Sequence, residues 1–259
     1  MGYPLNSAKD DLYYYPDSTN PNKFYVSSDR ESDCCLDLFE VNDRRHLLTG
    51  LIVDCETRKA LPGVKVSFVD SLSKQTLRMV TIGQSGKYIF KVNNDRPYNL
   101  VVEKPGYFTK VIHVSNKGKL INDTLYNAEI CMLGYDINKP IALKNILYDY
   151  GKTTLRAESM DVLNELVDIM SNNPQIKIEL SAHTDGIGND ASNNLLSQQR
   201  AEACVDYIIT KGINKDRIFA RGYGKTRPIA PNNLPDGRDN PDGRQLNRRT
   251  EFTVLKVEN

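Results

Sequence analysis

Two side chains of opposite charge stand where they could bind a zwitterion. Asp185 follows a stretch of alternating apolar and polar residues, 176–182, and Arg200 lies fifteen residues further along, in a helical pattern. A helix that follows a strand packs back against the sheet, so the strand end and the helix can bring these two side chains together. The carboxylate would take an ammonium, and the guanidinium would take a carboxylate. The alternative is an ordinary surface salt bridge.

No motif for catalysis or cofactor binding is present. The sequence lacks HExxH, GxSxG and GxGxxG. The string GYGKT at 222–226 resembles the end of a phosphate-binding loop, but Phe219 stands where the first glycine is required. The histidines are widely spaced: His46, His113 and His183. We therefore expect a binding protein without a cofactor or a bound metal, and not an enzyme.

Composition and charge restrict the class further. The chain has 259 residues, with 34 Lys and Arg against 33 Asp and Glu, so its net charge is +1. A dedicated nucleic-acid binder would carry a clear basic excess. The longest apolar runs, such as 47–53, are far shorter than the roughly 20 residues of a membrane-spanning helix. The N-terminus shows no signal peptide, so we expect the chain to be the C-terminal part of a longer protein.

The cysteines do not form a zinc site. None lies in a CxxC or at ligand spacing from a histidine. They are Cys34, Cys35, Cys55, Cys131 and Cys204. A disulfide such as Cys55 with Cys131 could form in an oxidising compartment, but the spacing does not establish the pairing.

The C-terminal part, 135–259, is expected to alternate strands and helices. Apolar periodicity predicts strands at 141–147, 176–182, 217–222 and 250–257, and helices at 154–171 and 191–211, with a polar loop before the last strand. The order β-α-β-α-β-β predicts an α+β fold in which one sheet carries two helices on one side.

The middle part, 45–134, reads as an all-β sandwich of the immunoglobulin or transthyretin type. Strands are expected at 47–54, 64–70, 77–82, 87–92, 98–104 and 109–115. Gly86 and Gly106 stand where a tight turn favours a residue without Cβ. Together with LPGV at 61–64 and the strand at 98–102, this pattern resembles the carboxypeptidase regulatory-like domain.

Residues 1–44 are expected to form a small all-β unit. The stretches DLYYYP, KFYVSSDR and CLDLFEV are strand-like and are separated by turn residues. The unit resembles the last blade of a WD40-like propeller. Alternatively, it is a leader that packs against the next domain.

A longer motif surrounds Asp185 and Arg200. Its anchors are Thr184, Asp185, Gly188, Asn193, Leu196, Ser197, Arg200 and Ala201, followed by G-x-G-x-x-x-P at 222–228 and N-R-R-x-E at 247–251. Over about 120 residues this pattern resembles the OmpA-like C-terminal domain, a peptidoglycan-binding module. It departs from the family in Gly186, where a polar residue is usual, and in the long loop 232–245.

The resemblance implies a ligand and a set of site residues. Asp185 would hold the ammonium of meso-diaminopimelate in the peptidoglycan stem peptide, and Arg200 would hold the carboxylate on the same carbon. Asp149, Thr184 and Asn193 would line the same pocket. Asp149 could instead cap a loop, and Asn193 could cap the helix start. The basic stretch 217–249 could assist binding or be a solvated loop, and calcium binding at 236–242 stays open.

The order of these domains implies a location. It is similar to that of an anchoring component of the type IX secretion system in Bacteroidetes. We therefore expect a periplasmic protein associated with the outer membrane and the cell wall, with other envelope or secretion-system proteins as partners. The alternative is a structural envelope protein whose OmpA-like domain mainly binds partner proteins.

Overall fold

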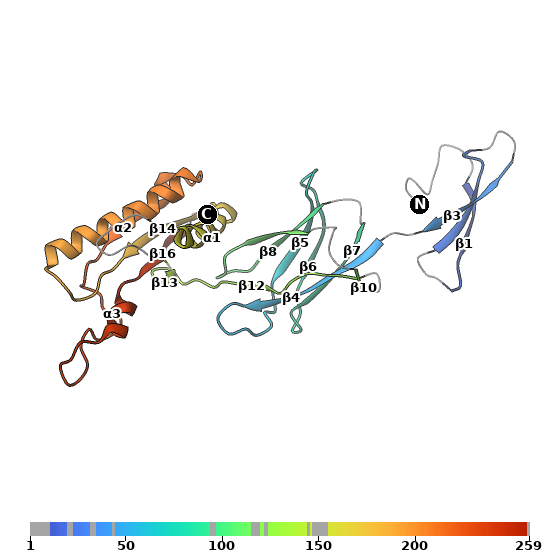
Figure 1. Ribbon diagram of the computed structural model, residues 1–259. Helices are drawn as coiled ribbons and strands as arrows, with labels where there is room; N and C mark the ends of the chain where they lie inside the picture. The colour runs from blue at the N-terminus through green and yellow to red at the C-terminus, as the bar shows by residue number, and fades with distance from the viewer. Residues whose placement is uncertain are drawn as a thin grey trace.

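The chain forms three bodies that lie in a row, each with its own sheet or sheets (Figure 1). The computed structural model describes residues 11–19, 23–31, 35–42, 45–93, 97–114, 120–121, 124–143, 146 and 155–257. In these residues, no helix is both long enough and apolar enough to cross a membrane.

The N-terminal body is a three-stranded antiparallel sheet. Its strands are β1 (Asp11–Pro16), β2 (Lys23–Ser28) and β3 (Asp37–Asn42), in the order β1-β2-β3. Phe24 and Val26 on the central strand are buried, whereas Tyr13, Tyr14 and Tyr15 are about half exposed. The sheet therefore buries few apolar side chains.

The middle body consists of two sheets that share one apolar core. One sheet has the order β6-β5-β8-β9 and the other β10-β11-β4-β12, with β7 also paired to β4. The strands are β4 (Arg45–Asp54), β5 (Lys65–Asp70), β6 (Thr76–Thr81), β7 (Lys87–Asn93), β8 (Tyr98–Glu103), β9 (Lys110–Val114), β10 (Leu120–Ile121), β11 (Thr124–Tyr126) and β12 (Ile130–Met132). Leu48 and Ile52 on β4 pack with Val66 on β5 and Leu100 on β8 inside this core.

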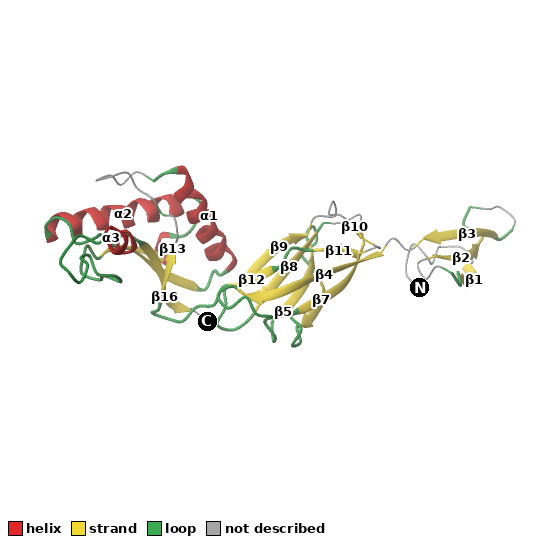
Figure 2. Ribbon diagram, turned by 60° about the horizontal axis from the view of Figure 1, so that its bottom comes forward, coloured by secondary structure: helices red, strands yellow, loops and turns green. Residues whose placement is uncertain are grey.

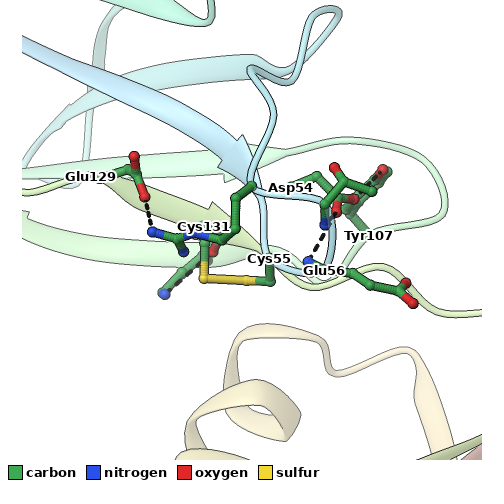
Figure 3. Close-up of a disulfide and its surroundings, with 9 residues drawn as sticks. Asp54, Cys55, Glu56, Tyr107, Glu129 and Cys131 are labelled. Carbon is green, nitrogen blue, oxygen red and sulfur yellow. Dashed lines mark hydrogen bonds and ion pairs between the residues drawn. A yellow bond between two sulfur atoms is a disulfide. The ribbon is translucent and has the colours of Figure 1, made fainter.

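A disulfide closes the middle body at one end. Cys55, directly after β4, is bonded to Cys131 on β12, so the pairing that the sequence left open is formed (Figure 3). Beside it, the Tyr107 hydroxyl donates a hydrogen bond of 2.9 Å to Asp54 Oδ2. Gly86 and Gly106 have φ of +69° and +80°, the left-handed conformation that favours glycine, so both turns are as expected.

The C-terminal body has a four-stranded sheet of order β13-β16-β14-β15. Helices α1 and α2 cover one face of it (Figure 2). The elements are β13 (Pro140–Leu143), α1 (Ala157–Asn172), β14 (Ile176–Ala182), α2 (Asp190–Thr210), the 3₁₀ turn Lys215–Arg217, β15 (Ile218–Gly222), α3 (Pro241–Asn247) and β16 (Thr250–Val257). This agrees with the mixed α+β fold expected for this part.

Two details of the C-terminal body differ from the prediction. The polar loop before the last strand contains α3, which Asn240 caps by accepting a hydrogen bond from the Gly243 amide. Pro241 in the first turn has the φ that a helix start requires. Of the strand expected at 141–147, β13 covers the part up to Leu143 and Ile146 is in no strand, whereas 144, 145 and 147 lie outside the described residues.

The middle and C-terminal bodies contact each other through residues 108 and 109. Phe108, in the connection between β8 and β9, is buried in the C-terminal core, where its ring lies 4.6 Å from Tyr135 and 6.0 Å from Phe252. Next to it, the Thr109 amide donates to Asn173 Oδ1 at 2.9 Å, and Asn173 Nδ2 donates to the Thr109 carbonyl at 3.1 Å. The buried ring and the paired hydrogen bonds hold the two bodies together.

Candidate functional site

A small polar pocket lies where β14 ends and β16 begins. Its volume is about 140 Å³. The residues that line it belong to β14, α2, α3, the start of β16 and the segments that follow β14, α3 and β13. They are Ile146, Ala182, His183, Arg200, Gln245, Arg248, Arg249 and Thr250. Three arginines and a histidine therefore line a space large enough for one small charged group.

Helix α2 places Arg200 in this pocket, because two glycines let the helix approach β15 closely. The Gly222 amide donates to Gln198 Oε1 at 2.7 Å, and the Gly224 amide donates to Ser197 Oγ at 2.8 Å. A Cβ on Gly222 would lie 2.2 Å from the backbone nitrogen of Gln198. Arg200 itself is 8% exposed.

Asp185 lies in the loop after β14 and is largely buried. Its Oδ2 accepts from Arg248 Nη1 at 2.5 Å and lies 3.5 Å from Arg244 Nη1. Its Oδ1 accepts from the Ile187 amide at 3.1 Å. Among the described residues, its ion partners thus come from the region of α3, and Arg200 is not one of them.

Arg244 on α3 is shared between two carboxylates. Its Nε and Nη2 donate to both oxygens of Asp239 at 2.8 and 2.6 Å, in a bidentate pair. The hydrogen bond with Asp239 is the main reason that the pKa of Arg244 is raised, with a smaller contribution from Asp185. Asp239 therefore holds this guanidinium more closely than Asp185 does.

A second carboxylate, Glu251 on β16, is buried between Arg249 and His183. Its Oε1 lies 2.6 Å from Arg249 Nη2 and 3.0 Å from His183 Nε2. The His183 approach has the distance of an ion pair, but neither ring nitrogen makes a well-aligned hydrogen bond to the described part of the chain. Burial raises the pKa of Glu251, but His183 and Arg249 outweigh it and hold the pKa below its usual 4.5.

Comparison with known proteins assigns this part of the chain. Residues 147–241 match the OmpA family. A photosystem I P700 chlorophyll a apoprotein A2 of Gloeobacter violaceus is 42% identical over 111 residues, which are 43% of this chain and 13% of that protein. The outer membrane porin F of Pseudomonas fluorescens is 36% identical over 110 residues, or 42% of this chain and 32% of the porin.

One solved structure is also similar to part of this chain. The peptidoglycan-associated lipoprotein from Burkholderia pseudomallei is 20% identical, with a TM-score of 0.37 over 45% of this chain and 90% of that one. The chain matches less than a third of the length of the two curated relatives named above.

The expected site residues occupy different positions in the OmpA-like domain. Thr184 is buried beside the pocket residue His183, and its Oγ1 has no hydrogen-bond partner in the described part of the chain. Asn193 is buried, and its Nδ2 donates to the Ile187 carbonyl at 2.8 Å, so it holds the loop that carries Asp185. The helix cap proposed for Asn193 is provided by Asn189 instead, whose side chain accepts from the Ser192 amide. Asp149 lies outside the described residues.

Several residues of the pocket were not expected from their spacing. Arg248, Arg249 and Glu251 belong to the N-R-R-x-E motif, but the sequence did not show that they meet Asp185 and His183. The signal for Arg244 was only that it lies in a long loop. The three aspartates at 236–242 do not gather around a cation, because Asp236 pairs with Arg238 and Asp239 with Arg244. The described residues contain no cluster with the ligands for a metal ion.

The pocket has the chemistry to bind a carboxylate. Its lining includes Arg200, Arg248 and Arg249, and the neighbouring counter-charges are Asp185 and Glu251. Arg248 pairs with Asp185 and Arg249 with Glu251, and in a confined space such guanidinium–carboxylate pairs are strong and directional.

Proposed function

We propose that this protein binds peptidoglycan non-covalently through the diaminopimelate of the stem peptide. The observation that carries the proposal is the arginine-lined pocket, to which the segment 147–241 that matches the OmpA family contributes His183 and Arg200. Asp185 lies beside it, paired with the lining residue Arg248. Diaminopimelate ends its side chain in an ammonium and a carboxylate on one carbon. Arg200 and Arg248 would hold the carboxylate, and Asp185 would hold the ammonium.

The cellular role that we propose is that of an anchor. The OmpA-like domain would hold an outer-membrane-associated complex to the cell wall from the periplasm. The disulfide between Cys55 and Cys131 supports an oxidising compartment. The middle body would be a carboxypeptidase regulatory-like domain and the N-terminal sheet the end of a propeller. With these parts the protein would resemble PorE of the type IX secretion system.

Co-sedimentation of the full chain with purified peptidoglycan tests the proposal. The Arg200→Ala variant should lose at least about 2 kcal/mol of binding, or about 30-fold, because its charge-assisted hydrogen bonds to the ligand carboxylate are lost. The control is Arg238→Ala, which removes the same charge from an exposed side chain. If wild-type protein stays in the supernatant, the domain binds partner proteins instead.

The choice of stem peptide makes the test specific for the pocket. A lysine-containing peptide keeps the ammonium but lacks the carboxylate, so it should bind about 30- to 700-fold more weakly, for a difference of about 2–4 kcal/mol. Calorimetric titration of the full chain with the two tripeptides measures this ratio. Equal affinities would mean that the arginines do not recognise the diaminopimelate carboxylate.

A further inference from the structure

The two departures of this domain from its family pattern meet in the structure. The long loop 232–245 contacts Gly186 directly, because Asn232 Oδ1 accepts from the Gly186 amide at 3.0 Å. Asn247 Nδ2 donates to the same oxygen at 3.1 Å. A Cβ on Gly186 would lie 2.9 Å from Asn232 Nδ2, so the glycine leaves room for the loop.

This contact brings α3 to the carboxylate of Asp185. Both oxygens of Asp185 already have partners in the ligand-free protein, since Oδ1 accepts from the Ile187 amide and Oδ2 is shared by Arg248 and Arg244. An incoming ammonium must therefore compete with guanidinium groups for the same oxygen.

The competition is adjustable because Arg244 has a second carboxylate. Its bidentate pair with Asp239 keeps its Nη1 at 3.5 Å from Asp185. Without Asp239, the guanidinium would be free to close on Asp185. Without Arg244, one of the two competing cations would be gone. The two ends of a single salt bridge should thus have opposite effects on the ligand.

We propose that Arg244 sets the affinity of this site by competing with the ligand's ammonium for Asp185, and that Asp239 limits this competition. Arg244 is a positioning residue, which acts through Asp185. The proposal rests on the proposed binding of diaminopimelate.

Titration of the full chain with the tripeptide L-Ala-γ-D-Glu-meso-diaminopimelate tests the competition. Arg244→Gln should bind about 2- to 5-fold more tightly and Asp239→Asn about 2- to 5-fold more weakly, the range expected for one solvent-accessible ion pair. The double variant should behave like Arg244→Gln, because without the guanidinium Asp239 has nothing to restrain. Both effects should shrink in 0.5 M salt, where the Debye length is only a few ångströms.

Matched controls separate competition from net charge. Arg238→Gln and Asp236→Asn make the same charge changes on the same loop, in the exposed pair Arg238–Asp236, and should leave affinity unchanged. Equal shifts in these controls would overturn the proposal. So would shifts of the same sign in Arg244→Gln and Asp239→Asn, which is what a merely structural role predicts.

A ligand-free measurement distinguishes this proposal from the proposed function. Hydrogen exchange of the Gly186 amide should be faster in Arg244→Gln and slower in Asp239→Asn, because the loop is held to Asp185 less or more firmly. If wild-type protein does not bind the tripeptide, the proposed function fails. Unchanged exchange in both variants overturns the competition at Asp185 whether or not the tripeptide binds.

Discussion

Glu251 shows how a buried charge is kept in place beside the pocket. Glu251 is 7% exposed. Its carboxylate forms an ion pair with Arg249 and lies next to the His183 ring. The backbone adds to this arrangement, because the His183 amide donates to the Arg249 carbonyl at 2.9 Å. The His183 ring also stacks on Tyr223, with the ring centroids 5.4 Å apart.

The lowered pKa of Glu251 predicts a specific dependence of stability on pH. A carboxyl group with a lower pKa in the folded state stabilises the fold above its unfolded value of 4.5, and this contribution is lost as the pH falls through the folded value. Glu251→Gln should therefore cost about 2–3 kcal/mol of unfolding free energy at pH 7. The difference from wild type should diminish below about pH 4.5.

Urea unfolding, monitored by the circular dichroism signal of the helices, measures this cost in the C-terminal body. The described α-helices all lie in the C-terminal body, so the signal reports on the OmpA-like domain. A difference between wild type and variant that stays constant from pH 7 to pH 3.5 would contradict the role of the charge.

At this scale, the motif identified residue types but not their contacts. Thr184, Asp185, Asn193 and Arg200 could be singled out because their spacing within one strand, loop and helix is local. The partners of Asp185 could not be predicted from spacing. Arg244 and Arg248 lie about sixty residues away, and they reach Asp185 only because Gly186 leaves room for Asn232.

At the scale of elements, the contact between α2 and β15 determines where Arg200 lies. The helix backbone approaches Gly222 so closely that no side chain fits between them. At the opposite end of β15, the Arg217 guanidinium links the strand to the end of α1 and the start of β14. It donates to the carbonyls of Met170, Asn173 and Ile176. Both contacts are made with backbone atoms, which cannot rotate away as side chains can.

Gly222→Ala should therefore be strongly destabilising. The added Cβ would lie 2.2 Å from the nitrogen of Gln198, and the helix must shift to accept it, at a cost of about 2–3 kcal/mol. Gly83→Ala is the control, since a Cβ there would meet nothing within 4 Å, and it should change stability by less than about 0.5 kcal/mol. Thermal unfolding of both variants gives the comparison. Similar melting temperatures would show that α2 can move without cost.

The elements that the sequence predicted well are those with a clear period. The strand 176–182 alternates cleanly, and the two long helices have apolar faces, so β14, α1 and α2 were located to within a few residues. The helix α3 has only seven residues. It is stabilised by the Asn240 cap and by hydrogen bonds to its surroundings, not by an apolar face. Its sequence therefore shows little apolar periodicity. The strands β10–β12 are two or three residues long, too short for alternation to be visible.

At the scale of the whole molecule, the C-terminal core is completed by a residue from the middle body. Phe108 is 3% exposed and packs with Tyr135 and Phe252, although it lies between two strands of the other sheet. The sequence predicted a boundary between these bodies near 134, but nothing in it indicated that Phe108 packs across that boundary. A fragment that begins after 134 would lack the ring, which is why the binding experiments use the full chain.

Phe108→Ala should consequently destabilise the OmpA-like domain. Removing a fully buried phenylalanine costs about 3–5 kcal/mol, and the loss should appear in the helical transition. Phe219→Ala is the matched control, because that ring is 47% exposed on β15 of the C-terminal body itself. Calorimetry of the two variants decides the point. If Phe219→Ala lowered the stability as much as Phe108→Ala or more, burial of the Phe108 ring would contribute little to this core.

The disulfide has a mechanical consequence for the anchoring role proposed above. β4 runs toward Cys55, and β12 runs parallel to it toward the connection into the C-terminal body. When the two ends of the molecule are pulled apart, tension leaves β4 at Cys55, crosses the sulfur–sulfur bond to Cys131 and enters residues 133–139. Residues 56–130 lie outside this covalent path, so tension carried along the covalent chain cannot extend that segment. Reduction of the bond would put that whole segment in series with the pull and let the tether lengthen.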